Sequence, residues 1–86
     1  MVDLLLLHPD DNVLILMRNA GAGEPLSSGN EHFICPADLT LGHKLAARDI
    51  QPGEKVLKYG LPIGSATCFI ARGEHVHQHN VKSDYA

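Results

Sequence analysis

The sequence contains no tryptophan, and only 5% of its residues are aromatic. Aromatic platforms on which nucleic-acid bases stack are therefore scarce. Basic residues are also few. The sequence has seven Lys and Arg residues and ten Asp and Glu residues, which gives a formal net charge of −3. Phosphate backbones are bound by basic surfaces. We therefore expect no nucleic-acid partner.

Long apolar runs are missing as well. The run 4–7, four leucines, is far shorter than the roughly 20 apolar residues that cross a membrane. The residues before it lack the positive charge of a secretory signal. Two cysteines, Cys35 and Cys68, are too few for the disulfide framework of a small secreted domain. The sequence thus predicts a cytoplasmic protein with reduced thiols and no membrane partner.

The 86 residues present suffice for one small domain, which we place at 1–86. Gly, Pro, Asn and Asp recur at short intervals, so the apolar runs between them are short and typical of strands. These runs are 4–7, 13–17, 33–35, 55–59 and 66–70. The pattern predicts a mainly β fold with at most one or two short helical turns, around 37–39 and 45–50. The polar residues 81–86 are expected to fray.

Histidine is the residue in excess, with six copies, and His75, His77 and His79 form an alternating tract. In an extended strand, residues two apart share a face, so the three rings would line up. Imidazoles on one face suit zinc, iron, copper or nickel, and two of them with a carboxylate or water would make an open site. A solvated, histidine-rich edge without metal is the alternative.

Two further clusters could carry chemistry. Gly42 allows a sharp turn that exposes His43 and Lys44, of which the first could transfer a proton and the second could hold a carboxylate. Lys58 and Tyr59 end an apolar run and point to opposite faces. An ordinary surface turn and an ordinary strand end are the alternatives. No nucleophile elbow or phosphate-binding loop is present.

Four motifs occur in a fixed order between His8 and Asn80, and residues 20–37 between them fit only loosely. They are His8-Pro9-x-Asp11-Asn12-Val13, Gly42-His43-Lys44-x-Ala46-x-x-Asp49-Ile50, Gly53-Glu54-x-Val56-x-Lys58-Tyr59-Gly60-x-x-Ile63-Gly64 and Gly73-Glu74-x-Val76-His77-x-His79-Asn80. This string resembles the SAF-type N-terminal domain of the altronate and galactarate dehydratase family. It is also similar to the separate small subunit of two-chain members, including sulfolactate sulfo-lyase.

The resemblance implies a β-clip fold of short bent strands. It also implies a part in removing water from a sugar acid to give a 2-keto-3-deoxy acid, with a divalent metal, typically Fe²⁺, or else Mn²⁺ or Zn²⁺. Activity would need a large catalytic subunit or C-terminal catalytic region, and assembly with further copies of the chain stays open. A sulfolactate sulfo-lyase subunit and a non-catalytic carbohydrate-binding or assembly module are the alternatives.

The resemblance also implies roles for individual residues. His77 and His79 become candidates for metal binding or proton transfer, and His43 and Lys44 are expected to face the same cleft as catalytic groups. Substrate contacts are expected from four residues, namely Lys44, Lys58, Tyr59 and Asn80. His75 departs from the bulky apolar or aromatic residue that the family has at this position.

Overall fold

The computed structural model describes residues 2–84, which form short antiparallel strands and no helix. The strands are β1 (Leu4–Leu5), β2 (Val13–Leu16), β3 (Pro25–Ser28), β4 (Glu31–Ile34), β5 (Lys44–Ala46), β6 (Lys55–Lys58), β7 (Leu61–Ala66), β8 (His75–Val76) and β9 (Val81–Lys82). They make a central sheet of order β1-β2-β5-β8, the hairpin β3-β4 and the sheet β6-β7-β9. The mainly β fold predicted from the sequence is confirmed.

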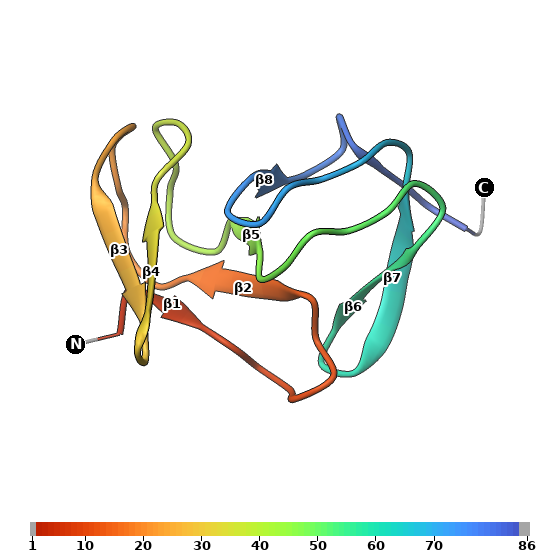
Figure 1. The fold of residues 1–86 in the computed structure, drawn as a ribbon, viewed down its shortest axis with the longest axis horizontal. Coiled ribbons are helices and arrows are strands. Elements are labelled where there is room, and N and C mark those ends of the chain that lie inside the picture. Colours follow the sequence, from red (N-terminus) through yellow and green to blue (C-terminus); the bar gives the residue numbers. More distant parts are fainter. Residues whose placement is uncertain (1, 85–86) are drawn as a thin grey trace.

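The two smaller sheets lie at opposite ends of the molecule, with the central sheet between them (Figure 1). β2 runs through the middle, and all four of its residues are buried. Successive side chains of a strand point to opposite faces, so β2 serves two cores. Leu14 and Leu16 pack with Leu26 and Phe33 of the hairpin, whereas Val13 packs on the side of β6-β7-β9.

A two-residue turn joins β6 to β7, and both of its residues have a positive φ, 57° at Tyr59 and 73° at Gly60. This conformation is unfavourable for a residue such as tyrosine and needs support from its surroundings. The buried carboxylate of Asp11 accepts hydrogen bonds from both turn amides, at 2.9 and 2.7 Å. The His8 ring also lies close to Gly60, so that a Cβ atom at this position would be only 3.0 Å from it. The first motif of the sequence therefore holds this turn.

Asn12, the neighbour of Asp11, ties β2 to β6. Its side-chain amide donates to the carbonyl of Lys55 and its oxygen accepts the amide of Leu57, at 2.9 and 2.8 Å. The side chain is fully buried, so both bonds are protected from water. Asp and Asn side chains in turns usually satisfy backbone amides close to them in sequence. Asp11 and Asn12 instead satisfy backbone groups more than 40 positions away.

Neither expected helical turn forms. Leu45 and Ala46 lie in β5, paired with β2 on one side and β8 on the other, and Leu39 pairs with Ala20 in an isolated bridge. The helical composition of 45–50 is overridden because both edges of this segment have a strand to pair with. Interior strands satisfy their backbone groups through such pairing.

Two strand boundaries also differ from the prediction. The strand expected at 66–70 ends at Ala66, and only Ile70 pairs further on, with Ile50. The fraying expected from residue 81 is absent at Val81–Lys82, which pair with Ser65 and Ala66 as β9. Gly64 permits this close approach, since a side chain there would collide with the carbonyl of Lys82. Residues 85 and 86 lie outside the described residues.

No helix long and apolar enough to cross a membrane occurs in the part of the chain that the structure describes.

Candidate functional site: a histidine cluster

The tract with three of the six histidines is a two-residue strand followed by a tight turn. β8 covers only His75 and Val76. The amides of Asn80 and Val81 then both donate to the carbonyl of His77, at 3.1 and 3.0 Å. The prediction of an extended segment through His79 is therefore wrong beyond Val76.

Asn80 produces this turn. Its side-chain amide donates to the carbonyl of His75, and its side-chain oxygen accepts the amide of His77, both at 2.9 Å. Asparagine competes with strand pairing in this way because its side chain offers the backbone alternative partners. The residue is only 2% exposed. We expected Asn80 to orient substrate or ligand, and its amide is engaged in fixing the backbone on both sides of Val76.

His43 reaches the same place from another part of the chain. It follows Gly42, whose φ of 95° allows the turn before β5. Because Lys44 in β5 pairs with Val76 in β8, the residues next to this pair are brought together. Nδ1 of His43 lies 2.9 Å from Nε2 of His75, so one ring donates to the other.

Three imidazoles consequently share one site. A ring nitrogen of His43, one of His75 and one of His77 all lie within 4.8 Å of one another. The rings of His75 and His77 are stacked, with centroids 5.3 Å apart. A tetrahedral ion with bonds of 2.0–2.1 Å would bring its nitrogen ligands to about 3.4 Å apart. The observed limit of 4.8 Å is wider than this spacing, so the rings would move closer together on binding an ion, and the donor set of three imidazoles fits a transition-metal ion.

The cluster differs from the pair predicted from sequence. His77 belongs to it, whereas His79 contributes no nitrogen, although its ring centroid lies 5.6 Å from that of His75. His75 is the third member of the cluster, and the alternating pattern of His75, His77 and His79 had indicated it as a possible ligand. The other two histidines lie elsewhere, His8 against the β6-β7 turn and His32 on β4.

Burial and the neighbouring charges favour the neutral imidazole at His75. Burial, followed by the neighbouring rings of His43, His77 and His79 and the charge of Lys44, lowers the pKa of His75 to about 4. Burial and then the charge of Lys58 lower the pKa of Lys44. An imidazole must be unprotonated to bind a metal. His75 is therefore ready to coordinate throughout the neutral range.

This shift predicts the pH dependence of stability in the metal-free chain. Between pH 6.5 and about 4, the unfolded chain takes up a proton at His75 that the folded chain does not. The unfolding free energy should therefore fall as the pH falls through this window. NMR titration should place the pKa of the His75 ring near 4. A His75→Gln variant should lose this part of the pH dependence, and an unchanged profile in that variant would contradict the assignment.

Lys58 and Tyr59, the other two predicted substrate contacts, have different surroundings. Lys58 is close enough for its charge to act on Lys44. Tyr59 is 62% exposed and lines an apolar groove of about 380 Å³ with Leu5, Met17 and Leu41. A concentration of exposed apolar side chains in one groove is typical of interaction surfaces.

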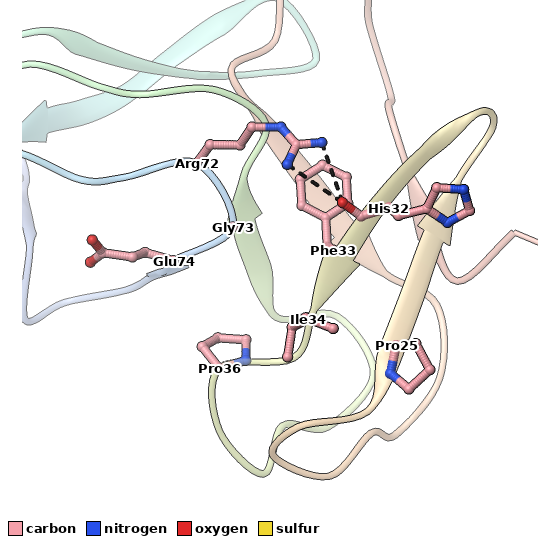
Figure 2. Close-up of a pocket in the computed structure, with 8 residues that line it drawn as sticks. All are labelled: Pro25, His32, Phe33, Ile34, Pro36, Arg72, Gly73 and Glu74. Atoms are coloured by element: carbon pink, nitrogen blue, oxygen red, sulfur yellow. Dashed lines mark hydrogen bonds between the residues drawn. The ribbon is translucent and has the colours of Figure 1, made fainter.

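A cavity of about 440 Å³, which is lined by none of the three histidines of the cluster, lies between the hairpin β3-β4 and the loop before β8. Figure 2 shows Arg72 across the ring of Phe33, with its guanidinium directed to the carbonyl of His32. The guanidinium carbon lies 3.9 Å from the ring centroid, a cation–π contact. These contacts link the hairpin to the loop that leads into His75, so we assign them a structural role.

The chain resembles known proteins over almost its whole length. The family profile described as "Altronate/galactarate dehydratase SAF domain" matches residues 2–84. The chain is 37% identical to the altronate dehydratase of Bacillus subtilis over 84 residues, covering 98% of this chain and 17% of that protein. It is 41% identical to the altronate dehydratase of Escherichia coli over 78 residues, covering 91% of this chain and 16% of that protein.

A third relative is of similar size to this chain. The (2R)-sulfolactate sulfo-lyase subunit alpha of Chromohalobacter salexigens is 36% identical over 93 residues, and the match covers 95% of each chain. The chain therefore spans less than a fifth of the two altronate dehydratases and nearly all of this subunit.

Proposed function

This chain belongs to the altronate/galactarate dehydratase SAF-domain family, and from that premise we propose that it is the small, metal-binding part of a lyase that removes water from a sugar acid. The product would be a 2-keto-3-deoxy acid. The observation that carries this proposal is the convergence of His43, His75 and His77 from two separate segments of the chain.

The proposed ion is divalent, with Fe²⁺ as the first candidate and Mn²⁺ or Zn²⁺ as alternatives. Its ligands in this chain would be the three imidazoles of the cluster, which is a donor set suited to iron and zinc. When bound, such an ion supplies Lewis acidity that stabilises the negative charge developing next to the substrate carboxylate. Three protein ligands leave positions open for substrate or water.

The remaining polar side chains divide the other tasks. Lys44 lies half-buried next to His43 and would hold the substrate carboxylate. His79 is exposed, and its ring centroid lies 5.6 Å from that of His75. We assign it the transfer of a proton to or from the substrate. Imidazole suits that task because it takes up and releases protons near neutral pH. Lys58, whose charge already acts on Lys44, would contact a second polar group of the substrate.

A large catalytic region would complete the site. Most of the length of the altronate dehydratases lies outside the matched segment, and the sulfo-lyase relative is by its name one subunit of an enzyme. The apolar groove with Leu5, Met17, Leu41 and Tyr59 offers a surface for that region to cover. We propose that the chain alone has no turnover.

A second candidate is the small subunit of a sulfolactate sulfo-lyase, in which sulfite leaves instead of water. The match to such a subunit favours it, because it covers 95% of the subunit alpha of Chromohalobacter salexigens at 36% identity. The histidine cluster would serve either reaction, because both begin by removing a proton next to a carboxylate.

The experiment is reconstitution with the large region, supplied as the rest of the polypeptide or as a separate subunit. The complex should form a 2-keto-3-deoxy acid from altronate or galactarate, or release sulfite from sulfolactate, and the isolated chain should do neither. His43→Ala should lower kcat of the complex by at least about 100-fold, while His32→Ala should leave it unchanged. Full activity of the His43→Ala complex would favour a non-catalytic binding or assembly module.

A further inference from the structure

Some of the Lys and Arg side chains form ion pairs with carboxylates and others do not. Of seven Lys and Arg residues, four have a carboxylate within 4.0 Å, namely Arg18, Arg48, Lys55 and Arg72. Lys44, Lys58 and Lys82 have none among residues 2–84. Among residues 2–84, these three lysines thus lie outside any ion pair, and the one carboxylate on which the charge of Lys82 acts, that of Asp84, is already paired with Lys55.

These three lysines are gathered beside the histidine cluster. Lys44 and Lys82 line one cavity of about 300 Å³, and the charge of Lys58 acts on Lys44 from outside it. Like charges that lie close together without a counter-ion destabilise the fold that holds them. An anion bound between them would remove this repulsion.

The cavity itself has the composition of an anion site. Its polar lining consists of Lys44, His77, Gln78, Lys82 and Ser83, its other walls are apolar, and no carboxylate lines it. Its volume is at the lower end of the range for small-molecule sites. His77 belongs to both the cavity and the metal-ligand group. A ligand held by the lysines would therefore lie next to the ion that we propose.

Lys82 is placed here by the pairing of β9 with β7, which Gly64 permits. We propose that the cavity between Lys44 and Lys82 binds a carboxylate of the sugar-acid substrate, with Lys82 as a substrate-binding residue. This inference rests on the proposed function for the identity of the acid. An acidic side chain of the large region is the competing occupant, and the cavity's contact with His77 favours the substrate.

The test is an NMR titration of the metal-free 86-residue chain with galactarate, and with galactitol as the matched polyol that lacks both carboxylates. Galactarate should cause saturable shifts at residues 76–78 and 81–83, and galactitol should not. Lys82→Gln and Lys44→Gln should each raise Kd about tenfold, since each removes one charge-assisted hydrogen bond. Lys82→Arg should keep most of the affinity.

Arg48→Gln is the matched control, because it removes one positive charge that lies outside the cavity and should leave Kd unchanged. Equal shifts with galactitol, no saturable shift with galactarate, or an unchanged Kd in Lys82→Gln would each overturn the inference. In the last two cases, Lys82→Gln should instead weaken binding of the large region. Metal binding by the histidine cluster is measured separately, so failure of the anion site and failure of the proposed function are distinguishable.

Discussion

Replacing His75 by alanine is expected to lower the affinity of the chain for Fe²⁺ or Zn²⁺ by at least about 100-fold. The variant loses one of three ligands, and even the loss of a residue that only supports a ligand costs 10- to 100-fold. The removed ring is also the hydrogen-bond partner of His43, so that ring loses its orientation. Competition titration against a chelator at neutral pH, under anaerobic conditions for iron, measures the effect.

The matched variant is His79→Ala, which removes an imidazole from the same tract. Because His79 contributes no nitrogen to the group, the metal affinity of the His79→Ala variant should stay within about twofold of that of the unsubstituted chain. The reverse result, with His79→Ala impaired and His75→Ala intact, would support the His77–His79 pair predicted from the sequence and contradict the observed cluster.

Replacing Asn80 by aspartate is expected to damage both the fold and the metal site. The new carboxylate has the same shape, but it faces the carbonyl of His75 with an acceptor where the amide donated. A buried group left without its partner costs about 1–3 kcal/mol, and a charged one costs more. We expect a loss of about 2–4 kcal/mol in unfolding free energy at pH 7, measured by urea denaturation.

The metal affinity of the same variant should fall about 10- to 100-fold under conditions in which it is folded, because Asn80 positions the backbone of two ligands. Asn30→Asp is the control, since it makes the same change at an exposed turn residue. Stability and affinity that match those of the control would show that the turn at 77–80 does not depend on this amide.

The class of fold can be predicted well from the sequence, because the fold class depends on local signals. Frequent turn residues with short apolar runs between them are sufficient to indicate short strands, and four of the five predicted runs overlap an observed strand by at least two residues. The helical composition of 45–50 misleads because a strand neighbours it on both sides, which is a long-range property. Likewise, Asp11 and Asn12 could be identified as backbone partners, but not as partners of residues 57, 59 and 60.

The site is only partly visible in the sequence for the same reason. The alternating tract identifies His75, His77 and His79 as neighbours, yet one buried amide at Asn80 decides where the strand ends and which rings converge. His43 joins them through the pairing of β5 with β8, about 30 positions apart. The role proposed for Lys82 depends on β9, a strand that the polar composition of 81–86 did not predict.

A crystal structure of the chain grown with iron or zinc, with anomalous diffraction recorded at the metal edge, tests the account most directly. It should show one strong peak at about 2.0–2.2 Å from a ring nitrogen of each of His43, His75 and His77. A peak bound by His79 in place of His75, or no peak at these rings with the metal at saturating concentration, would contradict it.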